Sequence, residues 1–385
     1  MTGRTSAASS STMSPLVKIT SQEQDLYANS KRIDLLGLPF EQLESLLDEW
    51  GVGRAQAKRV FRGVHVHRQD LEEIPSLGRH AQTINARSER VKAKLITSVT
   101  STDGTEKLLM EMKDGAQVEA VLLPMRRERY TLCVSTQVGC AMGCTFCATG
   151  SLGLKRALSA GEVVAQVYLA LDYVKKIVKE ESDRAQRSLS HLVFMGMGEP
   201  LHHYNRTRDA LKVLLAQNGV CFSARQVTVS TVGLVPAMRR FSKDFDGRVQ
   251  LALSLHAGTD KTRQKIMPVA KKWSLRHLKE ALLNHPLPGR RVLMLEYVVL
   301  PGINDSDEEL DGVADFQEGL RALINLIPFN PFTNSPFRSP TADEVTSVER
   351  RLKSRGVACS VRVTRGQDRA GACGQLAIQG FEVHS

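Results

Sequence analysis

Three cysteines are grouped in one short segment of the chain. Cys140, Cys144 and Cys147 follow a Cys-x3-Cys-x2-Cys spacing, so a single loop supplies three thiolates. A four-iron cluster takes one ligand per iron, and three protein ligands therefore leave one iron open to another molecule. Such an open iron is what reductive cleavage of S-adenosylmethionine (SAM) requires, and the radical chemistry then belongs to the cofactor.

A zinc site is the main alternative for these cysteines. Structural zinc sites usually take four ligands in paired Cys-x2-Cys spacings, and no second pair follows at a suitable distance. A Cys3His site with His191 or His256 as fourth ligand stays open at this point. A disulfide framework does not fit 385 residues with seven scattered cysteines. Cys221 and Cys359 are isolated, and we expect them to be buried small hydrophobic residues.

Composition indicates a globular protein with a nucleic-acid partner as one option. The chain is 42% hydrophobic, and its length predicts two or perhaps three domains. It has no apolar run of about eighteen residues and no secretory signal, so we expect a cytoplasmic protein that does not enter a membrane. The net charge of +11 indicates either an ordinary basic surface or a polyanionic partner.

Helical patterns precede the cysteines. Residues 1–30 are rich in Ser and Thr and predict a disordered tail. Apolar spacing predicts a helix over 35–47, a break at Gly51 to Gly53, and a second helix over 55–64. We expect residues 31–95 to form a small helical domain. Its basic face serves either solubility or RNA docking, and the cations on it are Arg54, Lys58, Arg59 and Arg62.

Strand patterns dominate the rest of the chain. Residues 96–132 predict a strand-rich connector with a hairpin turn at Asp114-Gly115. From 133 to 350, strands and helices alternate, which predicts a parallel sheet or an open barrel. Residues 351–385 form a C-terminal extension. The helices are expected over 160–178 and 206–217, and the strands over 191–195, 227–230, 249–255, 292–300 and 322–327. Polar residues recur at the strand ends, where barrels of this kind carry their active sites.

Four motifs occur together in order along the chain. They are the cysteine loop, Met195-Gly-Met-Gly-Glu-Pro200, Ser254-Leu-His256 and Ala372-Cys-Gly-Gln-Leu376. Together with Cys133, seven residues before the loop, they resemble the radical-SAM adenine methyltransferases of RNA, the RlmN/Cfr family, over roughly residues 33–380. The resemblance implies an α/β fold with an open six-unit (β/α) barrel. It also implies a helical RNA-binding domain before the barrel and a C-terminal extension over its mouth.

The resemblance assigns residues to two cofactors. Cys140, Cys144 and Cys147 would ligate one [4Fe-4S] cluster. A carboxylate at a strand end, such as Glu199, can accept a charge-assisted hydrogen bond from the ammonium of SAM, and an adjacent glycine permits close approach. Each of these positions alone would be an ordinary strand-end residue. The implied SAM-binding residues are Gly198, Glu199, Ser230, Ser254, Leu255, His256 and Asn330.

A covalent mechanism with two SAM molecules per turnover is also implied. Adenine carbons 2 and 8 are electron-poor, so Cys373 is first methylated as a thiolate nucleophile. A radical from the second SAM takes hydrogen from that methyl group, and the resulting carbon adds to adenine. Attack of Cys133 on the sulfur of Cys373 releases methyladenine and leaves a disulfide. Glu119 matches the position proposed to accept a proton, and its alternative is a solvent-facing strand residue.

Three functions stay open from sequence. The first is methylation of adenine carbon 2 in 23S rRNA and in tRNA beside the anticodon, with an electron donor such as flavodoxin. The second is methylation of carbon 8 of the same rRNA adenine, the resistance branch; the segments 327–331 and 364–366 favour the first branch. The third is a non-catalytic metal-containing RNA-binding module, which gives no reason for Cys133 and Cys373. Before Cys373 the family commonly has Asp-Ile-(Asp/Asn)-Ala-Ala, whereas this chain has Asp368-Arg-Ala-Gly-Ala, so we expect a looser or differently docked loop.

Overall fold

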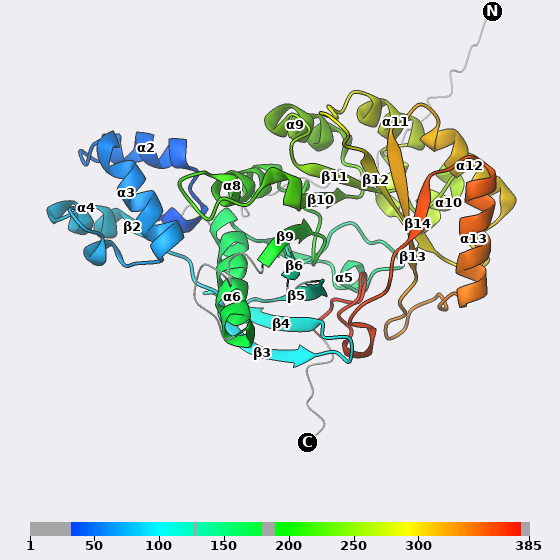
Figure 1. Cartoon of the computed structure of the whole chain (residues 1–385), viewed down its shortest axis with the longest axis horizontal. Coiled ribbons are helices and arrows are strands. Elements are labelled where there is room, and N and C mark those ends of the chain that lie inside the picture. Colours follow the sequence, from blue (N-terminus) through cyan, green and yellow to red (C-terminus); the bar gives the residue numbers. More distant parts are fainter. Residues whose placement is uncertain (1–31, 127–128, 179–188, 379–385) are drawn as a thin grey trace, which may run out of the picture.

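A small helical module lies beside a large sheet that is covered by helices (Figure 1). The computed structural model describes residues 32–126, 129–178 and 189–378, so the predicted tail over 1–30 lies outside the described residues. The elements of the module are β1 (Ile33–Asp34), η1 (Leu35–Gly37), α2 (Phe40–Glu49), η2 (Arg54–Gln56), α3 (Ala57–Arg62), η3 (Gly63–His67), η4 (Leu71–Glu73), α4 (Arg79–Arg87) and β2 (Ser88–Glu89).

The second predicted helix of the module is shorter than expected and ends in a wider turn. Its α-helical part covers only Ala57–Arg62, and Gly63–His67 continue as a π-helical turn. A Cβ at Gly63 would lie 2.3 Å from Cδ1 of Ile74, so glycine lets the turn pack closely on this neighbour. The turn brings His65 Nδ1 within 2.7 Å of the Tyr168 hydroxyl. This contact joins the module to the helix α6 (Ala160–Val178).

A ten-stranded sheet forms the centre of the molecule, in the order β14-β13-β12-β11-β10-β9-β6-β5-β4-β3. Neighbours from β6 to β14 pair in parallel, and β3 to β6 pair antiparallel. The strands are β3 (Lys94–Thr100), β4 (Glu106–Glu111), β5 (Gln117–Met125), β6 (Arg129–Cys133), β9 (Leu189–Phe194), β10 (Val227–Thr231), β11 (Gln250–Ser254), β12 (Leu293–Val299), β13 (Ala322–Pro328) and β14 (Cys359–Val361).

The sheet extends beyond the six predicted barrel strands on both sides. Residues 96–132 do not stand apart from the barrel, because Val121 of β5 pairs with Cys133 of β6 and continues the sheet. On the other side β14, from the C-terminal extension, adds a parallel strand next to β13. The described strands leave the sheet open, with β3 and β14 at its edges.

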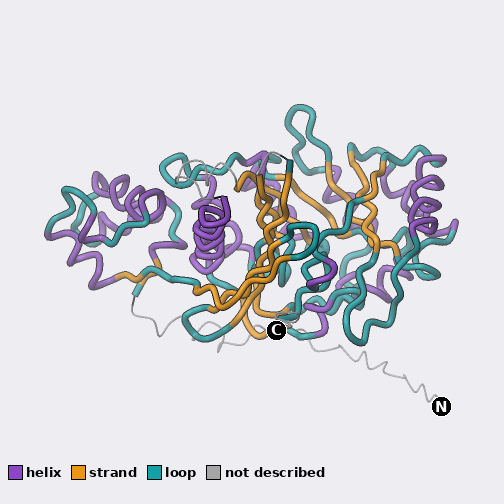
Figure 2. The backbone as a smooth tube through the Cα atoms, turned by 60° about the horizontal axis from the view of Figure 1, so that its bottom comes forward, coloured by secondary structure: helices purple, strands orange, loops and turns teal. Residues whose placement is uncertain are grey.

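Helices surround the strands, which run through the middle of the molecule (Figure 2). None of the helices in the described ranges combines the length and apolarity needed to cross a bilayer. Besides α6 they are α5 (Ala148–Ser151), α8 (Tyr204–Leu215), α9 (Val235–Phe245), α10 (Asp260–Ile266), α11 (Leu275–Leu283), α12 (Asp307–Gln317) and α13 (Ala342–Ser354), with short turns η5 (Ala224–Gln226), η6 (Pro268–Lys271) and η7 (Gln367–Arg369) and the hairpin β7 (Gln137–Gly139) and β8 (Leu154–Ala157).

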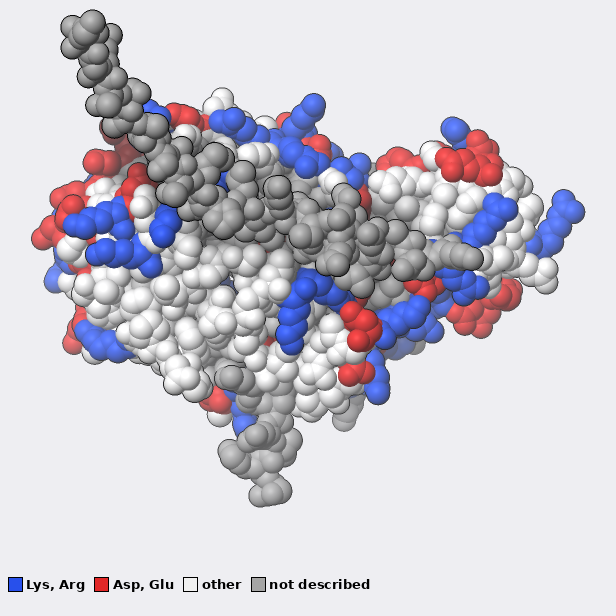
Figure 3. Space-filling view, turned by 180° about the vertical axis from the view of Figure 1, so that it is seen from behind, with Lys and Arg blue, Asp and Glu red and all other residues white. Residues whose placement is uncertain are grey.

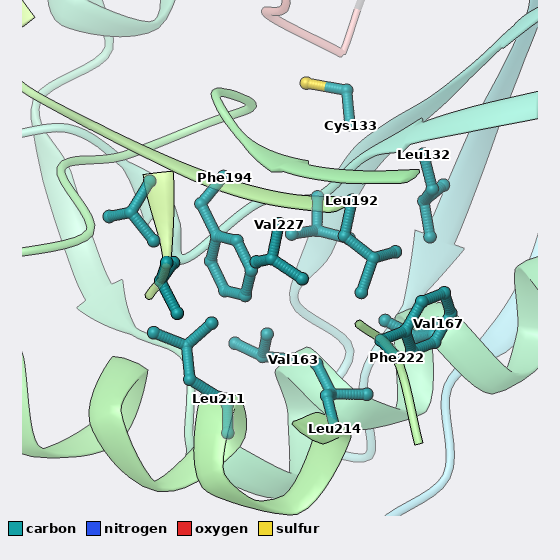
Figure 4. Packing of buried hydrophobic residues seen from close by; sticks show 14 of the residues in the cluster. Leu132, Cys133, Val163, Val167, Leu192, Phe194, Leu211, Leu214, Phe222 and Val227 are labelled. Atoms are coloured by element: carbon teal, nitrogen blue, oxygen red, sulfur yellow. The ribbon is translucent and has the colours of Figure 1, made fainter. Parts of the chain in front are cut away.

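The two faces of β6 serve different purposes. Leu132 points into the core, where side chains of the sheet pack against α6 and α8 (Figure 4). Cys133, the next residue, belongs to the same buried cluster, but its sulfur points to the other side of the strand from Leu132 (Figure 4), because successive side chains of a strand alternate between the faces of the sheet. The strand therefore places a thiol on the face opposite the helices.

Candidate active site

The hairpin β7–β8 fixes the first cysteine of the loop. The backbone N–H of Cys140 donates to the carbonyl of Gly153 over 2.9 Å. Gly139 has φ +79°, and a Cβ there would lie 1.9 Å from the same carbonyl oxygen. Glycine is therefore required next to Cys140, both for the positive φ and for the close approach.

Burial dominates the electrostatics of the three thiols. It raises the pKa of Cys140 to about 12 and the pKa of Cys144 well above its usual value, and the neighbouring thiols add to the effect. The pKa of Cys147 is raised for the same first reason. Bare thiols here would stay protonated, so the site needs a cationic partner to hold thiolates. Soft thiolate donors of this kind suit an iron–sulfur cluster.

A buried arginine lies beneath the cluster loop. Arg263 is fully buried and donates to the carbonyls of Val232, Ser254 and Leu255 at 2.7–3.0 Å. Its Nη1 has no hydrogen-bond partner among the described residues, and its charge lowers the pKa of Cys144. A buried guanidinium that interacts with Cys144 fits a site whose bound group is anionic. No spacing in the sequence marks this residue.

The described residues do not form a zinc-type site. No three His, Cys, Asp or Glu side chains in the described ranges converge on the position of a single metal ion. His191 lies at 2.9 Å from Ser190 Oγ and is absent from the linings of both cavities described below. His256 is also committed, since its Nδ1 accepts from the N–H of Val298 at 3.0 Å.

A cavity of about 160 Å³ lies at the ends of the parallel strands. Cys147 lies on its wall, next to Phe146. Six of the seven predicted SAM-binding residues line it: Gly198, Glu199, Ser230, Ser254, His256 and Asn330. Strands that are far apart in sequence therefore bring the predicted SAM site and one predicted cluster ligand together.

Leu255 is the predicted SAM-binding residue that does not line this cavity. Its side chain is fully buried in the main core. Its N–H donates to the carbonyl of Glu296 at 3.0 Å, and its own carbonyl accepts from Arg263. These contacts give Leu255 the role of holding Ser254 and His256 in place.

Glu199 is held rigidly on the cavity wall. One carboxylate oxygen accepts from the N–H of Val232 and the other from the N–H of Leu201, both at 2.9 Å. Burial raises its pKa to about 7, and these hydrogen bonds oppose the shift. Gly198 has φ +102°, and a Cβ there would lie 2.5 Å from Cβ of Gln137, so this position too requires glycine.

His256 presents a neutral ring to the same cavity. Burial lowers its pKa to about 3. Because its Nδ1 accepts from Val298, the remaining ring proton belongs on Nε2. The ring packs edge-on against Phe146 at a centroid distance of 4.7 Å. His256 can therefore donate one hydrogen bond without carrying charge.

A larger cavity of about 440 Å³ contains both predicted reacting cysteines on its wall. Cys133 reaches it from the end of β6, and Cys373 from the C-terminal segment. Cys373, Asn330 and Cys147 line both cavities, so the two cavities meet at Cys373. All of these cysteines are free thiols.

The segment that carries Cys373 is docked at several points. The carbonyl of Gly374 accepts from the N–H of Ala148 at 2.7 Å, and the carbonyl of Leu376 accepts from Thr149 Oγ1 at 2.5 Å. Upstream, Asp368 accepts from Ser101 Oγ and from the N–H of Thr102. The loop with the unusual sequence is thus tied to the β3–β4 turn, rather than loose.

Glu119 is buried, so the solvent-facing alternative is wrong. Its side chain is 0% exposed and forms an ion pair with Lys107 Nζ at 3.1 Å. Burial raises its pKa, and Lys107 together with the backbone N–H groups of Ile378 and Ala377 opposes this. It lies on β5 two residues before Val121, which lines the larger cavity, but Glu119 itself lines neither cavity.

Cys221 and Cys359 are not the buried residues that we expected. Cys221 is exposed with φ +57°, and Cys359 is half-buried. The neighbours of Cys221, Val220 and Phe222, are both buried, so the core takes those two side chains and leaves the thiol outside.

Comparison with known proteins agrees with the site described above. Residues 134–313 match the model of the Radical SAM superfamily. The Dual-specificity RNA methyltransferase RlmN 2 of Myxococcus xanthus is 40% identical over 92% of this chain and 93% of its own length. RlmN of Anaeromyxobacter dehalogenans is 42% identical over 90% and 92%, respectively. The chain belongs to the RlmN family of radical-SAM methyltransferases.

A solved structure supports the family assignment. The crystal structure of a radical SAM methyltransferase from Sphaerobacter thermophilus matches with a TM-score of 0.79 and 36% identity, covering 89% of this chain and 99% of that one. The predicted radical-SAM α/β fold and the enzyme class are thereby confirmed. Membership of this RlmN family also implies its cofactors, a [4Fe-4S] cluster and SAM.

Proposed function

We propose that this protein methylates carbon 2 of a specific adenine in 23S rRNA and of the adenine beside the anticodon in tRNA, using two SAM molecules per turnover. One observation carries the proposal: Cys133 and Cys373 share a cavity that meets the SAM cavity at Cys373. A thiol at such a junction, with a second thiol on the wall of the larger cavity, suits a covalent route to an unreactive ring carbon. Relatives named dual-specificity RNA methyltransferases support RNA as the substrate.

The cofactor-binding residues have separate roles in this proposal. Cys140, Cys144 and Cys147 would hold the cluster, and together with bound SAM it supplies a carbon-centred radical. Glu199 would accept from the ammonium group of SAM. His256 would donate from Nε2, and Asn330, whose Nδ2 lies 3.5 Å from the carbonyl of Cys373, would hold SAM beside that cysteine.

The two reacting cysteines would act in sequence. Cys373 would take a methyl group from SAM, and after loss of one hydrogen atom the carbon of this group would bond to the adenine ring. The adduct would then lose the ring proton and return one electron to the redox system that supplied it. Cys133 then attacks the sulfur of Cys373: a sulfur–sulfur bond forms, the sulfur–carbon bond breaks, and its electron pair passes to the carbon, which takes a proton. Glu119 is the proposed acceptor of the ring proton, since burial raises its pKa and Lys107 balances its charge.

The N-terminal module would dock the RNA. A groove of about 520 Å³ on it is lined by Lys58, Arg59 and Arg62, side chains that bind phosphate without reading sequence. In this organisation residues 31–95 bind RNA, 133–350 hold the cofactors and 351–385 carry Cys373. The protein would meet its RNA substrates in the cytoplasm, and a flavodoxin-like protein would supply electrons.

Two cysteine variants test the covalent route. Cys373→Ala should abolish methyl transfer while iron and sulfide contents stay at the parent level, because Cys373 is not a cluster ligand. Cys133→Ala should accumulate a covalent RNA–protein adduct, visible on a denaturing gel, since the resolving thiol is missing.

An exposed thiol provides the matched control. Cys221→Ala removes a cysteine that lies outside both cavities and should behave like the parent. Retained turnover in Cys373→Ala would contradict the mechanism. Recovery of only free RNA and free protein from Cys133→Ala under turnover conditions would remove Cys133 from its proposed role.

A further inference from the structure

Arg362 occupies the wall between the two cavities. It follows β14 directly, and its N–H donates to the carbonyl of Leu326 on β13 at 2.8 Å. Its side chain lines both cavities, as Cys373 does, and it shares the larger cavity with Cys133. The end of a paired strand therefore fixes the backbone of Arg362, and its side chain reaches the walls of both cavities.

The charges around Arg362 are one carboxylate and two thiols. Its charge interacts with Cys373, Glu296 and Cys133. Glu296, on β12, is 4% exposed; its Oε1 accepts from Asn325 Nδ2 at 3.1 Å, and its Oε2 has no hydrogen-bond partner among the described residues. A buried carboxylate that interacts with a guanidinium stabilises it in place.

Arg362 is the charged group that favours the thiolate of Cys133. Burial raises the pKa of Cys133 to about 12 and Cys373 adds to the effect, whereas Arg362 lowers it. The larger cavity also contains Arg126 and Arg365, but both are exposed to solvent, where charges are screened. Cys147 is the other thiol on this wall, and an uncharged N–H of Met195 is the remaining group that favours the Cys133 thiolate.

We propose that Arg362, held by Glu296, is a positioning residue that stabilises the thiolate of Cys133 for its attack on the sulfur of Cys373. The inference rests on the proposed role of Cys133 as the resolving thiol. In that step the thiolate contributes an electron pair to the new sulfur–sulfur bond, and the pair of the broken sulfur–carbon bond leaves with the carbon, which takes a proton. Only the thiolate is a competent nucleophile for this exchange.

Alkylation of Cys133 tests the proposal without requiring turnover. The full-length, cluster-loaded protein carrying Cys373→Ala is treated with iodoacetamide between about pH 7 and 10, and modification of Cys133 is quantified by peptide mass spectrometry. When Arg362→Gln is combined with Cys373→Ala, the pH dependence of Cys133 alkylation should move to higher pH. At pH 8 alkylation should be about tenfold slower, which is the effect of one pKa unit. Arg362→Lys should restore most of the rate, because the charge returns. Arg365→Gln, from the same cavity wall, should leave the profile in place.

A smaller shift in the same direction is expected when the carboxylate is removed. Glu296→Gln takes away the anion that holds Arg362 beside Cys133, so the alkylation profile of Cys133 should move to higher pH, by less than in Arg362→Gln. A profile of Arg362→Gln that coincides with the parent overturns the proposal. Where Arg362→Gln does not assemble a cluster, Glu296→Gln decides: an upward shift supports the proposal, and an unchanged or downward profile overturns it. Failure of the resolving role itself is seen separately, as the absence of an RNA adduct in Cys133→Ala.

Discussion

Glu199 combines a fixed position with a pKa that lies in the physiological range. Its two oxygens are oriented by backbone N–H groups, and burial raises its pKa to about 7. Above that pH the carboxylate is ionised and can pair with the ammonium of SAM; below it the neutral carboxyl cannot. His256 lies in the same cavity, but its pKa of about 3 keeps it from titrating in this window.

SAM affinity should therefore depend on pH through Glu199. We expect the Kd for SAM to rise about tenfold for each pH unit below about 7, because binding must then first remove a proton. Calorimetry of cluster-loaded protein at about pH 6 and pH 8 checks this. Glu199→Gln should bind SAM more weakly and with no pH dependence in this range. A Glu199→Gln protein with the parent's pH dependence would assign the effect to another group.

Functional residues can be predicted from the sequence when they belong to a spaced motif, and they cannot when they stand alone in an ordinary segment. Cys140, Cys144 and Cys147 are visible from their spacing, and the SAM-binding positions from the resemblance. Arg263 and Arg362 are single arginines in ordinary segments. Their importance comes from burial and from contacts across strands, and neither property follows from local pattern.

Among the elements, the hairpin β7–β8 places a strict demand on sequence next to Cys140. Gly139 and Gly115 have nearly equal φ values of +79° and +80°. A Cβ at Gly139 would lie 1.9 Å from the Gly153 carbonyl oxygen, whereas a Cβ at Gly115 would meet no atom within 4 Å. Gly115 is therefore a matched control for the cost of positive φ alone.

Gly139→Ala should displace the hairpin that positions Cys140 and lower the iron and sulfide bound per chain after anaerobic reconstitution. Gly115→Ala introduces the same unfavourable positive φ for alanine but no clash, so we expect it to retain the parent's iron content. Equal iron contents in the two variants would show that the close approach of Gly139 does not matter for cluster assembly.

Long, strongly periodic elements are the ones that sequence predicts well. The predicted helix over 160–178 coincides with α6, because its apolar spacing matches the face that it buries. The π-helical turn at Gly63–His67 was not predictable, since it depends on packing against Ile74 and Tyr168. The short strand β14 was missed because three residues carry too little pattern.

At the scale of the whole molecule, the net charge of +11 does not form a single basic patch on the face that Figure 3 shows. On that face basic and acidic side chains are interleaved at both ends of the molecule, and the visible area between the ends is largely uncharged, with a smaller group of basic and acidic side chains near the middle. Net charge alone therefore does not locate an RNA site. The cationic groove at Lys58, Arg59 and Arg62 gives a specific place to test.

RNA affinity should fall as salt rises, because phosphate contacts release counterions. Changing Lys58, Arg59 and Arg62 together to Gln should flatten the slope of log K against log salt by about 1 for each lost phosphate contact. Filter binding over a range of salt concentrations measures it. The control, Arg239, Lys243 and Arg276 changed to Gln on α9 and α11, removes the same charge elsewhere. Equal effects of both triple variants would mean that total charge governs binding.

Whole-molecule contacts were the hardest feature to predict. Alternating strands and helices correctly predict a largely parallel sheet, but they do not show that β6 lies between β5 and β9. Nor do they show that Asp368 accepts a hydrogen bond from Ser101, which lies 267 residues earlier in the chain. Such pairings depend on the complete fold, although they determine where Cys373 meets Cys133.

One measurement tests the central claim most directly. Anaerobically reconstituted protein is incubated with SAM, a reductant and unmodified 23S rRNA, and the digested RNA is analysed by nucleoside mass spectrometry against standards. We predict 2-methyladenosine. A product of 8-methyladenosine would place the chain in the resistance branch, and no methylated adenosine, with an intact cluster and confirmed cleavage of SAM, would contradict the proposed reaction on this RNA.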